Sequence, residues 1–350
     1  MAGQIIDLAG RPLATMCDEL AALVVESVAV LLEGEIGQRA KRDGSLLCTL
    51  SHLSLSTPGW GQYGELMVDL AKQVVDLRRE NGSWPRDYVG SELGGMLGLA
   101  EGLAAFSAVV AETNAWGLAR ELVLRSLARC DSADYVGLSQ GGQLVPEGAR
   151  CLGEWAQILR VCTRLLQKRP DRELEIAAAR AVAAVVNYHY KADRGLLTEL
   201  VRHDFFHFDD HWGEYVHSGA VFEVLAALLY EAGRGGEDRL FGLACRYLRQ
   251  HLEASWDSLA GGVRDEWVAG AWQTSQTDQT QMKAFAALAI AVGFQGSDWE
   301  VEWLDRVINN RGYKAVSDPL ASSIWLVQAS AILDDLVRRE GRRVDWLSDH

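Results

Sequence analysis

Helical patterning runs through almost the whole chain without a linker, and this continuity most limits what the chain can fold into. Apolar residues recur every three or four positions, as on one face of a helix. The pattern gives segments at 13–36, 61–80, 92–112, 116–130, 147–169, 172–191, 217–233, 236–254, 277–293, 299–310 and 319–339. Only six prolines occur, and no Pro-, Ser- or Gly-rich stretch separates the segments. We therefore expect residues 1–350 to form a single all-α domain.

Strand-like segments are few and short. They are Gly195 to Leu200 and Gly262 to Trp267, the second directly after a Gly-Gly turn. Nothing alternates with the helices as a βαβ unit would require, so these segments are expected to be hairpins within loops. The stretch from Arg39 to Asp43 is short and mixed in charge, and is expected to be solvated.

Two architectures can hold this many antiparallel helices. An open solenoid of helix pairs should show a repeat of about 34–47 residues, and no such signature recurs here. The alternative is a toroid of helix hairpins with an inner and an outer ring. In a toroid all inner helices start at the same end, so their first turns should line one cavity.

The starts of alternate segments meet this demand. Sets of residues spaced by three open the fifth, seventh and ninth segments, namely Glu154 and Gln157; His217, Ala220 and Glu223; and Asp278 and Gln281. Residues three apart share a helix face. The third segment opens with Ser91-Glu92-Leu93-Gly94-Gly95, which is Gly-rich where an inner ring would be crowded. The even-numbered segments mostly begin with ordinary surface charge. The sequence therefore predicts a closed ring with a polar pocket at one end.

The charge of the chain excludes several partners. The formal net charge is −14, and the basic residues are scattered singly, so no nucleic-acid or anionic-membrane surface is expected. The acidity fits a neutral or cationic ligand better than a phosphorylated one. No apolar run reaches about 18 residues, and Met1 to Leu13 lacks the pattern of a signal peptide. The six cysteines show no CxxC or zinc spacing. A reduced, cytoplasmic protein is the expectation.

The loop from Tyr188 to Glu223 holds five of the eight histidines together with several carboxylates. Loops so rich in titratable groups commonly bind ligands, and Asp210, His211 and Glu214 are candidates for this. The histidines match no known ligand pattern, so neither a metal nor another cofactor is expected.

Twelve tryptophans are many for 350 residues. Trp84, Trp155 and Trp212 lie at loops or helix starts, where an indole ring can face the apolar side of a sugar beside hydrogen-bonding carboxylates. Trp116, Trp303 and Trp325 lie on helical stripes and are expected to fill space between helices.

Three motifs give the chain a resemblance to a known family. They are D-x-G-L-L-x-E at Asp193–Glu199, a Gly-x-x-x-Glu helix start at Gly219–Glu223, and W-D-x-x-x-G-G at Trp256–Gly262. In this order they resemble the N-acylglucosamine 2-epimerases and their relatives, the cellobiose 2-epimerases and mannose isomerases. The resemblance covers about a quarter of the chain, from Asn187 to Trp267. It implies an (α/α)6 barrel, in agreement with the toroid.

The resemblance also implies a proton-transfer site built on two histidines, from which this chain departs. The first histidine position falls near Glu154 and its companion glutamate near Gln157. In the second motif the glutamate is kept as Glu223, but Ala220 stands where the histidine is expected. The last histidine region corresponds to Asp278 to Gln281. His217, one turn before Ala220, is the candidate to replace a missing histidine.

The leading hypothesis is an aldose–ketose isomerase or 2-epimerase whose small-molecule ligand is a sugar. Glu154, His217, Glu223 and Asp278 would move protons, and the ligand-binding groups would be Trp155, Gln157, Trp212, Asp210, His211, Glu214, Gln281 and Trp84. A homodimer is left open as the oligomeric state. Three alternative functions also stay open. One is a glycoside hydrolase or lyase using two carboxylates, such as Asp209-Asp210 with Glu214 or Asp265-Glu266. Another is a terpenoid cyclase holding Mg²⁺ on the DDxxxE run Asp209–Glu214. The last is a non-catalytic binding protein.

Overall fold

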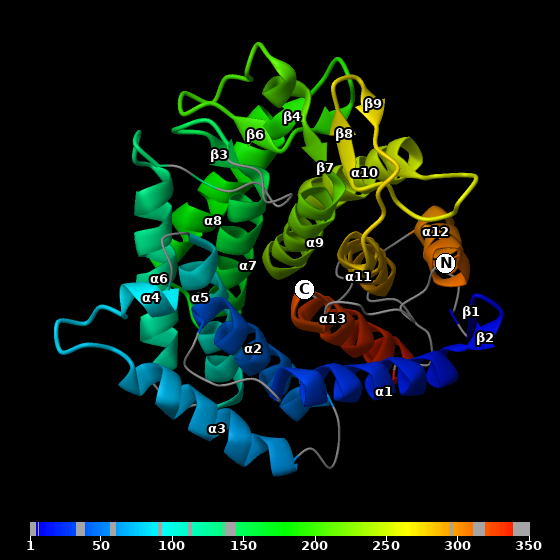
Figure 1. Ribbon diagram of the computed structural model, residues 1–350. Helices are drawn as coiled ribbons and strands as arrows, with labels where there is room; N and C mark the ends of the chain where they lie inside the picture. Colours follow the sequence, from blue (N-terminus) through cyan, green and yellow to red (C-terminus); the bar gives the residue numbers. More distant parts are fainter. Residues whose placement is uncertain are drawn as a thin grey trace.

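Two concentric rings of helices make up the molecule (Figure 1). The computed structural model describes residues 5, 7–32, 39–56, 61–89, 93–110, 114–135, 137, 145–294, 297–310 and 319–338. Within these residues, twelve helices pair into six hairpins, each made of one outer and one inner helix. The predicted all-α (α/α)6 toroid is therefore confirmed.

The inner ring is closed by contacts between neighbouring helices all the way round. Its members are, in order, α2 (Ala40–Ser56), α5 (Leu93–Val109), α7 (Leu152–Lys168), α9 (Ser218–Gly235), α11 (Asp278–Phe294) and α13 (Pro319–Arg338), and α13 packs against α2. Each inner helix also packs against the outer ring. For this reason α9 and α11 are buried on nearly every side and are apolar almost all round.

The outer ring covers the inner one. It consists of α1 (Leu13–Leu32), α3 (Gly61–Asp76), α6 (Ala115–Cys130), α8 (Arg172–Ala184), α10 (Asp238–Ser255) and α12 (Asp298–Asn310). The buried apolar residues of these helices recur with the helical period. In α10, for example, Ala244, Leu248 and Leu252 are buried at intervals of four. A separate single-turn helix, α4 (Arg86–Val89), lies in the connection between α3 and α5.

The two ends of the barrel differ, because long connections and nearly all strands gather where the inner helices begin. The strands at this loop-rich end are β3 (Arg150–Cys151), β4 (Tyr190–Lys191), β5 (Leu196–Leu197), β6 (Leu200–Val201), β7 (Val216–His217), β8 (Glu266–Val268) and β9 (Ala271–Trp272). The described connections at the other end are short, for example 169–171 between α7 and α8. The pair β1 (Asp7–Leu8) and β2 (Arg11–Pro12) precedes α1.

The expected hairpins are present, but two of the strand pairings are not local. β4 pairs with β5, as a local hairpin does. In contrast, β3 pairs with β6, and β7 pairs with β8. These pairings tie successive loops together across the end of the ring. The segment predicted as a helix at 172–191 ends its α-helix at Ala184 and continues as a π-helical turn, Val185–His189, before β4.

The prediction of a solvated stretch at Arg39 to Asp43 was wrong, because this stretch opens the inner helix α2 and Asp43 is buried. Many Ser and Thr residues hide the helix from a propensity argument. In the structure their hydroxyls donate to the carbonyl one turn back, which satisfies them inside the helix. The donors are Ser45, Thr49, Ser51 and Ser54.

Five of the six cysteines are buried and all six are free thiols. None of the described helices has the length and apolar character needed to cross a membrane. Of the residues predicted to open an inner helix, Ser91 and Glu92 lie outside the described part of the chain.

Candidate functional site

Four charged side chains from four inner helices meet inside the barrel. Arg160 of α7 donates through Nη2 to Glu101 Oε2 of α5 at 2.7 Å and through Nη1 to Glu223 Oε1 of α9 at 2.8 Å. Lys283 Nζ of α11 lies 2.7 Å from Glu223 Oε2. We call Glu101, Arg160, Glu223 and Lys283 the central ion network.

A tryptophan of a fifth inner helix closes this network. Trp325 of α13 is buried, with the Arg160 guanidinium 4.6 Å and the Lys283 ammonium 5.7 Å from its ring centroid. Both cations therefore gain a cation–π contact in a site that excludes water. The expectation that Trp325 packs between helices holds, and its ring also faces charge.

Burying the charges of the central ion network costs free energy of desolvation. The side chains of Glu101, Glu223 and Lys283 are each at most 5 % exposed, and that of Arg160 is 9 % exposed. Removing charges from water costs free energy that pairing often only balances, and an apolar set of similar volume is frequently more stable. Such clusters are therefore candidates for function.

His217 stands next to this network at the start of α9. Its Nδ1 accepts a hydrogen bond from Ala220 N at 3.2 Å and so caps the helix. Burial, together with the positive charge of Lys283, lowers the pKa of His217 to about 4. The imidazole is therefore neutral near pH 7, and its proton is on Nε2, because Nδ1 is the acceptor.

Gly219 allows this position of the imidazole. A Cβ on Gly219 would lie 2.8 Å from His217 Cε1 and 3.2 Å from Thr280 Oγ1. Only glycine leaves room for the ring to lie against the first turn of α9. The Gly-x-x-x-Glu motif thus places His217 and Glu223 at one end of the same helix.

Residues one turn closer to the loop-rich end line the approach to the network. Gln157 precedes Arg160 by three positions and Gln279 precedes Lys283 by four, so each shares the face of its charged neighbour. Both glutamines are half-buried, and Lys41 of α2, which is exposed, is close enough to lower the pKa of Lys283. Burial is the larger cause of that lowered pKa.

Glu154 lies away from the central ion network. Its carboxyl contacts the Tyr135 hydroxyl and, at 3.8 Å, Cys130 Sγ at the end of the outer helix α6. Burial raises the pKa of Glu154 to about 7, although the hydrogen bond from Tyr135 opposes the shift. Trp155, the neighbouring candidate platform, is fully buried between Phe205 and Arg180 of α8.

The raised pKa of Glu154 predicts a pH effect on stability. The fold gains stability from this group below its unfolded pKa of 4.5, and this gain is lost as pH rises through about 7. Glu154→Gln should match the wild type near pH 5 and be more stable by about 1–2 kcal/mol near pH 8, the full shift being discounted for partial exposure. Urea unfolding at both pH values measures the difference. A constant difference between the two proteins would contradict the assignment.

Asp278 and Gln281 share a helix face, as expected, but not the face of Lys283. Asp278 precedes Lys283 by five residues, which turns it about 140° around α11. Gln281 is buried, and its amide accepts from Val263 N at 2.9 Å and donates to Val263 O at 2.7 Å. It therefore fixes the turn that follows Trp256. Gln279 lies on the same face of α11 as Lys283, and it was not among the residues predicted from the sequence.

The loop at 203–216 lies between β6 and β7 at the loop-rich end. Asp210 caps the 3-10 turn His211–Glu214 by accepting from Trp212 N, and Glu214 pairs with Arg194 at 2.6 Å. Trp212 is half-buried edge-on against Tyr215 and stacks near His211. Among the described residues, no group of three His, Cys, Asp or Glu side chains is arranged to hold a metal ion.

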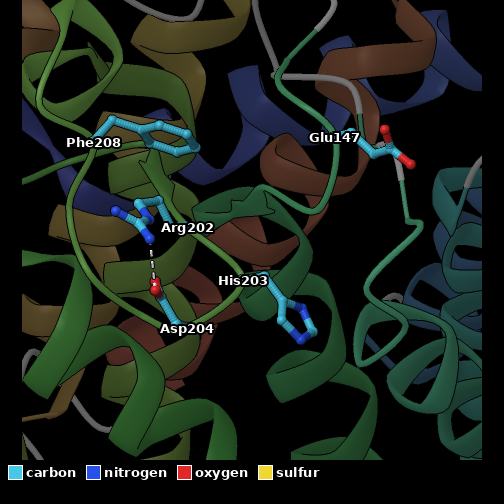
Figure 2. Close-up of a pocket in the computed structure, with 5 residues that line it drawn as sticks. All are labelled: Glu147, Arg202, His203, Asp204 and Phe208. Atoms are coloured by element: carbon cyan, nitrogen blue, oxygen red, sulfur yellow. Dashed lines mark hydrogen bonds and ion pairs between the residues drawn. The ribbon is translucent and has the colours of Figure 1, made fainter.

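A surface pocket of about 250 Å³ lies on this loop, outside the ring (Figure 2). It is lined by Glu147, Arg202, His203, Asp204 and Phe208. Figure 2 shows Arg202 and Asp204 facing each other, with Glu147 on a separate segment. Arg202 Nη2 lies 2.8 Å from Asp204 Oδ2. All the charged members are solvent-exposed. We place the candidate site at the central ion network, since exposed ion pairs contribute little and are common.

Trp84 is buried near α3, where its indole Nε1 donates to Val74 O at 3.2 Å and Arg78 covers the ring. Among the candidate residues, the structure thus brings His217 and Glu223 together, with Gln157 above them. It puts Glu154, Trp155, Trp84, Asp278 and the loop residues elsewhere.

The sequence analysis missed Glu101, Arg160 and Lys283. A usable signal was present for two of them, because each is a lone charge in an apolar run: Glu101 within LGLAEGLAAF and Lys283 within QMKAFAALAI. Charged residues are almost never fully buried unless they are paired. Lone charges at such positions therefore point to partners across the barrel.

The fold and the central ion network define the class of protein: it is an (α/α)6 barrel of six helix hairpins with charged side chains at its centre. Several solved structures share the fold. A cellobiose 2-epimerase from Spirochaeta thermophila superposes with a TM-score of 0.72 at 13 % identity, over 93 % of this chain and 98 % of that one. A sugar epimerase from a ruminal bacterium gives 0.70 at 10 % identity, over 93 % and 99 %.

A D-mannose isomerase gives a TM-score of 0.69 at 10 % identity, over 90 % of this chain and 97 % of that one. An α-1,6-mannanase from Salegentibacter sp. HEL1_6, in complex with α-1,6-mannotetrose, gives 0.64 at 12 % identity, over 91 % and 99 %. No protein-family model and no curated protein matches the sequence. At such low identities the likeness establishes the fold, and it confirms the fold that the epimerase resemblance implied.

Proposed function

We propose that this protein is a carbohydrate-active enzyme that transfers a proton at the carbon next to a sugar carbonyl, as an aldose–ketose isomerase or 2-epimerase does. The observation that carries the proposal is the buried pair of Lys283 and Glu223, 2.7 Å apart, beside a neutral His217. The shared fold with sugar epimerases and a mannose isomerase supports the choice of substrate class.

Lys283 is suited to be the base. Burial lowers the pKa of its ammonium, and an amine with a lowered pKa can both take and return a proton near neutrality. Glu223 holds the Lys283 side chain and stabilises its charged form. Arg160 in turn fixes Glu223 through Nη1. In this proposal Lys283 is the proton-transferring residue, a role that the sequence had suggested for Glu154 and Asp278.

His217 is suited to stabilise the oxygen at which negative charge develops. Its pKa of about 4 keeps the imidazole neutral, so Nε2–H can donate a hydrogen bond to the sugar carbonyl without losing its proton. The hydrogen bond from Ala220 N fixes the tautomer that this requires. Gln157 and Gln279 would donate to sugar hydroxyls at the approach.

The test is exchange of the proton at C2 in deuterated water, followed by NMR with mannose, cellobiose and N-acetylglucosamine. Lys283→Met should lower the exchange rate by about 10²–10⁴, and His217→Asn by about 10² or more, while asparagine retains the cap on α9. Glu175→Gln, on the outer helix α8, is the control and should match the wild type. Absence of exchange with every sugar would refute the proposal.

A glycoside hydrolase is the second candidate, because Glu101 and Glu223 are held by the same guanidinium. A hydrolase needs one carboxyl to act as a general acid, whereas both of these carboxylates form ion pairs with Arg160. Release of reducing ends from α-1,6-mannan would favour this candidate over the isomerase. Sugar binding without either reaction would favour the non-catalytic alternative.

A further inference from the structure

A second cationic position lies in the barrel on the side of the central ion network away from His217. Arg164 follows Arg160 by four residues on α7, one helical turn closer to the end with short connections. Its Nη1 donates to Cys48 Sγ at 3.0 Å, and its Nη2 donates to His52 Nε2 at 2.8 Å. Both partners belong to α2.

Neither of these partners is an anion. His52 accepts from a guanidinium and is therefore neutral, and burial together with the charge of Arg164 lowers its pKa to about 3. Burial raises the pKa of the Cys48 thiol, although Arg164 opposes that shift. Arg160 bonds two carboxylates, whereas Arg164 bonds two neutral groups.

Among the described residues, no carboxylate forms a hydrogen bond or ion pair with Arg164. Glu101 stabilises its charge from a distance, but Glu101 Oε2 is already bonded to Arg160. Arg164 is partly exposed and has no hydrogen-bonded anion among the described residues, so Glu101 offsets the cost of desolvating its charge only from a distance. The local charge is therefore positive inside a chain whose net charge is −14.

Tyr230 belongs to α9, the inner helix that packs against α7, so its hydroxyl can supply a further donor near Arg164. The two side chains are close enough to shift each other's pKa, and burial raises that of Tyr230 to about 12, so the hydroxyl keeps its proton. Its ring stands edge-on to Phe294 at 5.9 Å. Arg164, His52 and Tyr230 are all partly exposed, which leaves them accessible.

We propose that Arg164 and Tyr230 form a binding site for a small oxyanion, a carboxylate or a phosphate, at the short-connection end of the barrel. A planar guanidinium is the side chain best suited to oxyanions, and the hydroxyl adds a second donor. The site is separate from the proposed sugar site and does not depend on the proposed function.

The test compares thermal unfolding in phosphate, in acetate and in chloride at equal ionic strength. Phosphate or acetate should raise the Tm of the wild type by about 2–5 °C at millimolar concentration, and the stronger of the two identifies the anion. Arg164→Met should abolish this shift and be about as stable as the wild type in chloride, because the charge that it removes has no hydrogen-bonded anion. Arg164→Lys and Tyr230→Phe should reduce the shift.

Arg172→Met is the matched control, since Arg172 is exposed on α8 and the change in net charge is the same. It should keep the full anion shift. Equal shifts in Arg164→Met and Arg172→Met would show only general screening and would overturn the site. A wild type that does not respond to either oxyanion would also overturn it, even if Arg164→Met does not fold.

Discussion

Replacing Glu223 by glutamine is expected to lower the free energy of unfolding by about 3–5 kcal/mol. The change removes the carboxylate that both Arg160 and Lys283 contact, at 2.8 and 2.7 Å. Each cation then stays buried with less compensation, and that cost exceeds the value of the lost contacts. Urea unfolding followed by circular dichroism measures the loss.

Two further variants show whether buried charge is the cause. Glu175→Gln breaks a contact of Arg234 with a carboxylate that is 47 % exposed, and it should cost less than about 1 kcal/mol. Adding Lys283→Met to Glu223→Gln should recover part of the loss, because one of the two affected cations is then removed and Arg160 keeps its bond to Glu101, and the coupling should be about 1–3 kcal/mol. If Glu223→Gln costs no more than Glu175→Gln, the network is not buried as described.

Replacing Gly44 by alanine is expected to destabilise the protein by about 2–4 kcal/mol. A Cβ at Gly44 would lie 2.1 Å from Gly98 O and 2.8 Å from Leu99 N, so the backbones of α2 and α5 would have to separate. The same close approach of α2 and α5 predicts the relative cost in free energy of two more variants. Gly102→Ala, at 2.5 Å from Gly44 O, should cost somewhat less, and Gly98→Ala, at 3.1 Å from Lys41 Cα, should cost least.

The control for this series is Gly242→Ala on the outer helix α10. A Cβ there meets no atom within 4 Å, so alanine should stabilise the helix by about 0.5–1 kcal/mol through its better helix propensity. Chemical denaturation of all four variants gives the ranking. A Gly44→Ala protein as stable as Gly242→Ala would mean that α2 and α5 do not pack backbone to backbone.

The fold could be predicted because helix formation and burial leave a local periodic signal. Leu174, Ala178 and Val182 repeat along one face of α8, and only a closed arrangement buries so many such faces. The helix that escaped prediction, α2, combines a weak amphipathic pattern with residues of low helix propensity. Its hydroxyl-rich composition is compatible with a helix only because each hydroxyl bonds back to its own helix and the ring supplies the packing.

Only part of the candidate site follows from the sequence, and the reason is geometric. Spacing by three correctly put Asp278 and Gln281 on one face of α11, but spacing does not reveal which face is turned inward. Glu154 illustrates the same ambiguity, since it contacts Tyr135 and Cys130 of the outer layer. His217 and Glu223 were found because a motif placed them together at one helix start.

The sequence by itself determined that this chain forms paired helices in a closed ring, because periodicity is a property of neighbouring residues. Only the tertiary structure decided that Glu101, Arg160, Glu223 and Lys283 meet. They are separated by about 60 residues at each step along the chain, and no local pattern encodes the rotation of four helices about their axes. Packing between the two rings sets that rotation, and it turns isolated charges into one network.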